Sequence, residues 1–208
     1  MPVVAQASQL VTTSEASPSW LFATCQNDAC RYRFPVASNQ LSGLHCPRCA
    51  DTLEFGPALP VRDYPAVPRA NARVPLRAML DNIRSLHNVG SMFRTADGAG
   101  IEHLYLCGIT ATPDNPRLAK TALGAEQSVA WSSHRNALDL AGSLREQGVS
   151  LWALERTAAA VPVAAAPTPG STVVLIVGNE RAGVDPQLLE LCDLVIELPM
   201  SGGKGSLN

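Results

Sequence analysis

Residues 196–208 read Ile-Glu-Leu-Pro-Met-Ser-Gly-Gly-Lys-Gly-Ser-Leu-Asn, and this stretch is the most informative part of the sequence. The apolar run from Leu194 to Leu198 predicts a buried strand, which leads through Pro199 into a glycine-rich loop. The segment Gly202–Ser206 does not fit the phosphate-binding pattern G-x-x-x-x-G-K-[ST], because Gly205 follows the lysine and no helix pattern comes after it. A dinucleotide-binding G-x-G-x-x-G turn after a strand is also absent, so a doubly wound nucleotide site is not expected.

Strand and helix patterns alternate from Leu76 onward, which predicts an α/β fold with a parallel sheet. Asp185 and Pro186 are a typical N-cap and first residue of a helix, and Asn88 is expected to cap the first helix. We expect strands at 77–80, 103–107, 150–153, 172–177 and 194–198, and helices at 89–99, 118–125, 136–147 and 186–191.

Composition divides the chain into four segments. Residues 1–19 are rich in Ser, Thr, Ala and Gln and predict a disordered tail, and residues 57–75 contain five prolines and predict an extended linker. Between them lies a cysteine-containing unit at 20–56, and residues 76–208 form the α/β domain. No apolar run is long enough to cross a bilayer, and residues 1–20 lack the basic start of a secretion signal. A cytoplasmic protein without membrane contact is expected.

The four cysteines of the first unit have the spacing of metal ligands. Cys25-x4-Cys30 and Cys46-x2-Cys49 are separated by fifteen residues, which suits a structural zinc ion of zinc-ribbon type. A unit of this size has too little core to fold alone, and zinc would supply the missing stability. Two disulfides are disfavoured because no secretion signal is present, and a redox Cys-x-x-Cys lacks the expected βαβ context. Cys107 and Cys192 lie in apolar contexts and are expected in the core.

Three segments in order resemble the motifs of a known enzyme family. They are Asn88-Val-Gly-Ser-Met-Phe-Arg94, Ile176-Val-Gly-Asn-Glu-Arg-Ala-Gly183 and the terminal stretch 196–208. Together they resemble the SpoU (TrmH-type) RNA 2′-O-ribose methyltransferases of the SPOUT superfamily, over about residues 76–208. The resemblance implies a trefoil-knotted parallel sheet flanked by helices, S-adenosylmethionine as methyl donor, and transfer to an RNA ribose 2′-hydroxyl.

The resemblance also implies roles for individual residues. Arg94 would be the catalytic arginine, and because a guanidinium stays protonated up to about pH 12 it is expected to act as an electrostatic clamp rather than a base. Asn88 would shape the site and Glu180 would stand near the cofactor and the subunit boundary. The other implied site residues are Ser206 and Asn208 at the reacting centre, and Gly178, Ile196, Leu198, Met200 and Leu207 around the cofactor.

The implied partners are RNA and a second copy of the chain. The net charge of −2 gives no overall attraction to RNA, so contacts must come from local clusters, and the candidate cluster is Arg69, Arg73, Arg77 and Arg84. The residues do not distinguish tRNA from rRNA. Family members continue into a C-terminal helix that completes the knot and the dimer, and the printed sequence stops before it. Weakened cofactor binding and dimerisation are therefore expected, and a non-catalytic RNA-binding protein with a degenerate SPOUT domain stays the alternative.

Overall fold

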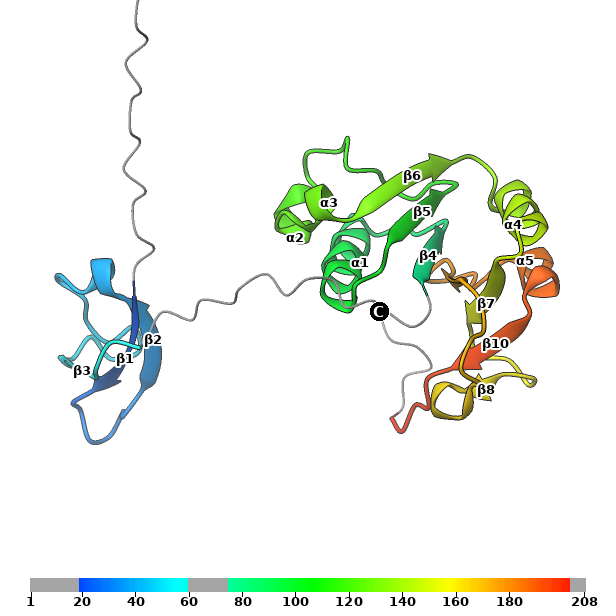
Figure 1. Cartoon of the computed structure of the whole chain (residues 1–208). Helices are drawn as coiled ribbons and strands as arrows, with labels where there is room; N and C mark the ends of the chain where they lie inside the picture. The colour runs from blue at the N-terminus through cyan, green and yellow to red at the C-terminus, as the bar shows by residue number, and fades with distance from the viewer. Residues whose placement is uncertain (1–18, 60–74, 203–208) are drawn as a thin grey trace, which may run out of the picture. The chain divides into compact units, whose positions relative to one another are not determined.

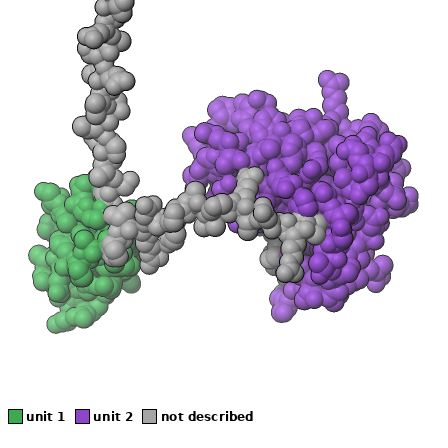
Figure 2. Space-filling model, in the orientation of Figure 1, with its two compact units in different colours: residues 1–67 green, residues 68–208 purple. Residues whose placement is uncertain are grey.

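The computed structural model describes residues 19–59 and 75–202. The chain divides into two compact units, residues 1–67 and 68–208 (Figure 2). The predicted tail and most of the predicted linker lie outside the described residues. Among the described helices, none is long and apolar enough to cross a membrane.

The first unit is built on a small antiparallel sheet with strand order β2-β1-β3. Strand β1 spans Trp20–Cys25, β2 spans Arg33–Ala37 and β3 spans Leu53–Phe55, and a short 3-10 helix, η1, covers Ser38–Gln40. Alternate residues of β1 turn inward, so Leu21 and Ala23 are buried. They pack with few other apolar side chains, so the core of this unit is small.

The second unit is a seven-stranded sheet in the order β6-β5-β4-β9-β7-β10-β8, and every strand pair in it is parallel (Figure 1). The prediction of a parallel α/β sheet is therefore confirmed. The strands are β4 (Leu76–Asp81), β5 (His103–Cys107), β6 (Ala130–His134), β7 (Ser150–Leu154), β8 (Val161–Pro162), β9 (Val173–Val177) and β10 (Leu194–Glu197). The helices are α1 (Leu86–Ala99), α2 (Ala119–Ala122), α3 (Ala125–Ser128), α4 (Ala137–Glu146), α5 (Pro186–Leu191) and the 3-10 helix η2 (Val163–Ala165).

Helices cover both faces of this sheet and give it two core layers. Successive residues of β4 point to opposite faces, so Leu80 joins the layer under α1, α2 and α3, and Met79 joins the layer under α4 and α5. Phe93 of α1 and Leu188 of α5 are completely buried in the two layers. Cys107 is buried in the second layer as expected, and the half-buried Cys192 donates its thiol to the Leu188 carbonyl oxygen.

The late strand β9 lies between two earlier strands, β4 and β7, and β10 lies between β7 and β8. From β4 the chain first adds β5 and β6 on one side of this strand. The later strands β7 to β10 then lie on the other side of β4 in the same sheet. In open parallel sheets, the carboxyl ends of the strands at such a reversal form the crevice where ligands bind. The topology therefore points to the ends of β4, β9 and β7.

Several boundaries differ from prediction. Helix α1 begins at Leu86, and its N-cap is Ser85, whose hydroxyl accepts the backbone N–H of Asn88; the prediction that Asn88 caps this helix is wrong. The predicted helix 118–125 is instead two short helices, because Leu123 and Gly124 both adopt left-handed backbone angles. Strands β6 and β8 were not predicted. Asp185 caps α5 as predicted, since its side chain accepts the backbone N–H of Gln187, and Asn136 caps α4 in the same way through the N–H of Leu138.

Candidate active site

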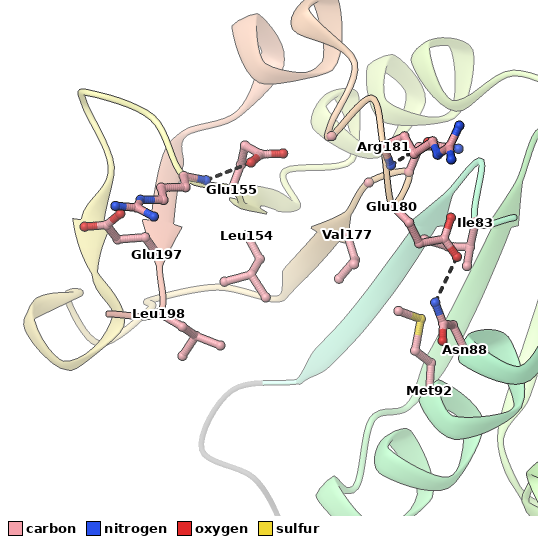
Figure 3. A pocket seen from close by; sticks show the side chains of 14 residues that line it. Ile83, Asn88, Met92, Leu154, Glu155, Val177, Glu180, Arg181, Glu197 and Leu198 are labelled. Atoms are coloured by element: carbon pink, nitrogen blue, oxygen red, sulfur yellow. Dashed lines mark hydrogen bonds between the residues drawn. The ribbon is translucent and has the colours of Figure 1, made fainter. Parts of the chain in front are cut away.

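A cavity of about 360 Å³ opens at the carboxyl ends of β4, β7, β9 and β10, beside the start of α1 (Figure 3). Leu154, Val177 and Leu198 come from three different strand ends and form an apolar wall. Glu180 and Asn88 face each other beside α1, and Glu155 and Glu197 stand at the opposite side of the cavity. The volume falls in the range of small-molecule sites, which are mostly apolar with a few orienting polar groups.

The loop that follows β9 is folded tightly on itself. The backbones of Asn179 and Gly183 exchange two hydrogen bonds of 3.0 and 2.9 Å. A Cβ on Gly178 would lie 2.3 Å from the backbone of Gly183 and Val184, so only glycine fits there. Gly183 has a φ of 76°, which also favours glycine. The glycines predicted for the second motif are thus required by the shape of the loop.

Glu180 ties this loop to the start of α1. Its carboxylate accepts the backbone N–H groups of Arg84 and Ser85 and the side-chain amide of Asn88, each at 2.9 Å. Burial acts to raise the pKa of Glu180, but these donors outweigh it, so the pKa lies below the ordinary glutamate value of 4.5. Residues from the first and second motifs are therefore joined in one charge-assisted network at the mouth of the cavity.

Sequence reasoning missed three residues that shape the cavity. Glu155, directly after β7, accepts the backbone N–H of Val184 at 2.9 Å and so holds the far end of the loop. Asn179 donates its side-chain amide to the carbonyl oxygen of Asn82 at 2.6 Å, which fastens the loop to the end of β4. Glu155 and Asn82 each follow an apolar strand immediately, and that position was the signal that could have found them.

Two faces of helix α1 have different surroundings. Gly90 packs against α2 so closely that a Cβ there would lie 2.0 Å from the Thr121 hydroxyl oxygen. Asn88 and Met92 line the cavity at the ends of the strands. Arg94 is exposed and lines a second, more open hollow of about 500 Å³ between α1, α2 and α3. Within one chain, the predicted catalytic arginine is thus on a different hollow from the candidate cofactor cavity.

The remaining predicted site residues have varied positions. Leu198 and Gly178 line the cavity, Ile196 is buried in β10, and Met200 is half-buried just beyond that strand. Arg77 is engaged within the chain, since it donates to the Tyr105 hydroxyl at 3.2 Å and lies 3.8 Å from the Glu102 carboxylate. Arg84 is exposed beside Glu180. The predicted residues Ser206, Leu207, Asn208, Arg69 and Arg73 lie outside the described residues.

In the first unit, the four predicted cysteines converge. The sulfur atoms of Cys25, Cys30, Cys46 and Cys49 all lie within 4.8 Å of one another, and all six cysteines of the chain are described as free thiols. The residues after the second cysteine of each pair, Arg31 and Ala50, share a left-handed backbone conformation. The two cysteine loops therefore share a positive φ at the residue after their second cysteine.

The thiols differ in their electrostatic surroundings. Burial raises the pKa of Cys25 to about 12. Burial opposes ionisation of Cys46 as well, but backbone N–H groups of Arg48 and Cys49 and the Cys49 and Cys25 thiols lower its pKa to about 7. These four sulfur atoms are the group of potential metal ligands among the described residues.

The second unit is similar to known proteins. The model of the SpoU rRNA Methylase family matches residues 75–208. The chain belongs to this family. A similar protein is the 23S rRNA (guanosine(2553)-2′-O)-methyltransferase RlmP of Bacillus subtilis, with 35% identity over 132 residues, which are 62% of this chain and 51% of that protein. The 23S rRNA (guanosine-2′-O-)-methyltransferase RlmB of Vibrio parahaemolyticus is 29% identical over 67% of this chain and 56% of its own length. This SpoU family chain thus spans little more than half the length of these relatives.

Solved structures of the SpoU type share the fold. The AdoMet-bound rRNA methyltransferase of Sinorhizobium meliloti superposes with a TM-score of 0.60 and 28% identity, over 64% of this chain and 51% of that one. The TrmH/SpoU tRNA modifying enzyme of A. aeolicus gives a TM-score of 0.57 and 27% identity, over 65% of this chain and 68% of that one. Both matches cover about two thirds of this SpoU family member, a share close to that of its second unit.

Proposed function

We propose that this chain methylates the 2′-hydroxyl of a ribose in RNA, with S-adenosylmethionine as the methyl donor. The observation that carries the proposal is the cavity at the strand ends, which is lined by residues of all three family motifs and has the Glu180 network at its mouth. The relatives that the chain matches are named as 23S rRNA 2′-O-methyltransferases, which favours ribosomal RNA over tRNA as substrate.

The residues of the cavity fit the methyl donor. Leu154, Val177 and Leu198 offer an apolar surface for an adenine ring, and exposed backbone groups after β9 and β10 can read its edge. When bound, S-adenosylmethionine would supply the methyl group of its sulfonium: the C–S bond would break as the ribose O–C bond forms, S-adenosylhomocysteine would leave as a neutral thioether, and the hydroxyl proton would pass to solvent. The chain's own contribution is to fix the loop 178–184 through Glu155 and Glu180, so that the cavity is formed before the ligand arrives.

Arg94 is proposed to stabilise the developing negative charge on the ribose oxygen and a neighbouring phosphate. A guanidinium is a poor base because its pKa lies above about 12, whereas its planar array of N–H donors suits oxyanions. Because Arg94 and the cofactor cavity occupy different hollows of one chain, we propose that the active site is completed across a homodimer. The insertion of β9 and β10 between earlier strands supports the trefoil knot that the family resemblance implies.

The first unit is proposed to hold a structural zinc ion. The sulfur–sulfur distances of 3.4 Å between Cys25 and Cys49 and 3.8 Å between Cys30 and Cys46 are close to the roughly 3.8 Å edge of a zinc–thiolate tetrahedron. Zinc would link four positions of a unit with a small core and so stabilise its fold. The ion has no part in methyl transfer.

The experiment measures binding of the cofactor and methyl transfer to RNA separately. Isothermal titration of the chain with S-adenosylmethionine is expected to show one site per chain, and Gly178→Ala is expected to lose it because its Cβ would overlap the Val184 backbone. Methyl transfer to unmodified 23S rRNA is then expected for the parent chain. RNA binding with neither cofactor binding nor transfer would instead favour the non-catalytic RNA-binding alternative.

A further inference from the structure

Leu123 combines two unfavourable features. It has a φ of 54°, in the left-handed region that leucine rarely adopts, and the residue is 70% exposed. Among the described residues, it is the only exposed large apolar side chain with a positive φ. Glycine would adopt this backbone conformation without strain, and a polar side chain would be better solvated. Leu123 belongs to none of the hydrophobic clusters of the described residues.

The surrounding backbone holds Leu123 in this position. Its N–H donates to the Ala119 carbonyl oxygen at 2.9 Å, which ends α2. Gly124 follows with a φ of 93°, and its N–H is accepted by the Glu126 carboxylate at 3.0 Å. The leucine side chain is therefore presented from a fixed turn between two short helices.

Leu123 lines the same hollow as Arg94. The floor of this hollow consists of small residues, and a Cβ added to Gly124 would meet no atom within 4 Å. Arg94 is the basic side chain among the residues that line the hollow, and the Asp97 carboxylate, which also lines it, accepts the Ser128 hydroxyl at 2.9 Å. The hollow thus offers a guanidinium for a phosphate or ribose and an apolar surface for a base, which are the two parts of a nucleotide.

We infer that Leu123 is a substrate-positioning residue that packs against an RNA base next to the ribose held at Arg94. The inference rests on the proposed function, because it takes RNA as the ligand of the Arg94 hollow. A base splayed from its stack needs an apolar surface in place of its lost neighbour, and a leucine held rigidly by a turn provides one at little entropic cost. Binding of RNA then supplies the packing that Leu123 lacks in the free protein.

The test compares Leu123→Gly with the parent chain. Glycine relieves the backbone strain and removes the apolar surface, so Tm is expected to rise by about 2–4 °C. The Kd for an unmodified 23S rRNA transcript is expected to rise roughly 3- to 10-fold, and the Kd for S-adenosylmethionine is expected to stay unchanged. Leu123→Asn, which also tolerates this backbone conformation, is expected to weaken RNA binding similarly. Val163→Ala, at an exposed position near the opposite edge of the sheet, is the control.

The measurement separates this inference from the proposed function. If the parent chain binds RNA without methylating it, the proposed function fails, and the inference is still decided by the RNA Kd of Leu123→Gly. An unchanged RNA Kd in both Leu123 variants overturns the inference. A fall in molecular mass by sedimentation equilibrium in these variants also overturns it, because Leu123 would then be a subunit contact. A parent chain without measurable RNA binding overturns both proposals.

Discussion

Glu180→Gln is expected to destabilise the second unit by about 1–2 kcal/mol. The Glu180 carboxylate accepts three N–H donors at 2.9 Å. A glutamine oxygen can still serve Ser85 and Asn88, but its amide NH₂ would face the backbone N–H of Arg84, so one charge-assisted hydrogen bond is lost and two are weakened. Such bonds are worth about 1.5–3 kcal/mol when buried, and the exposure of Glu180 reduces this. Tm is expected to fall by about 3–8 °C.

The same contacts predict a pH dependence with a definite sign. The pKa of Glu180 is lowered in the folded chain, so its stabilising contribution is fully present above the ordinary value of 4.5 and is lost as pH falls through the lowered pKa. The Tm difference between parent and Glu180→Gln should therefore be constant from pH 7 to about pH 5 and narrow in more acidic solution. Thermal melts followed by circular dichroism measure it, with the exposed Glu146→Gln as control. Equal Tm values for Glu180→Gln and the parent at pH 7 would refute the reasoning.

Three further predictions concern packing and metal. Gly90→Ala should lower Tm by about 5 °C or more, since its Cβ would overlap Thr121, and Thr121→Gly should restore part of the loss in the double variant; additive losses would contradict this. Gly178→Ala should weaken S-adenosylmethionine binding at least roughly 10-fold, and unchanged affinity would contradict the tight loop. A zinc chelator, or Cys49→Ser, should unfold the first unit and leave the melting of the second unchanged, as tryptophan fluorescence and calorimetry can show.

The sheet could be predicted because its central strands are locally unambiguous. Val173–Val177 is apolar at every position, as a strand covered on both faces requires, and Asp185 with Pro186 marks a helix start. Strand β6 was missed because it lies at the sheet edge and carries Ser132, Ser133 and His134, which hide the strand pattern. The position of β9 between β4 and β7 is a tertiary property that periodicity does not encode.

The candidate site was predictable only in part. Glu180 was selected through its motif, and the structure adds its hydrogen bonds to the start of α1. Asn88 was assigned the wrong local role, because Ser85, three residues earlier, already caps the helix and leaves the Asn88 amide for Glu180. Glu155 was missed because its partner, the Val184 N–H, is distant in sequence and close only once β7 and β9 pair.

The measurement that tests the central claim most directly is transfer of labelled methyl groups from S-adenosylmethionine to unmodified 23S rRNA, followed by alkaline digestion. A methylated 2′-hydroxyl prevents cleavage at its own nucleotide, so the account predicts label in alkali-resistant dinucleotides. Arg94→Ala should abolish that label and keep cofactor binding, because Arg94 lines a different hollow from the cofactor cavity. Label found only in mononucleotides, or undiminished in Arg94→Ala, would contradict the account.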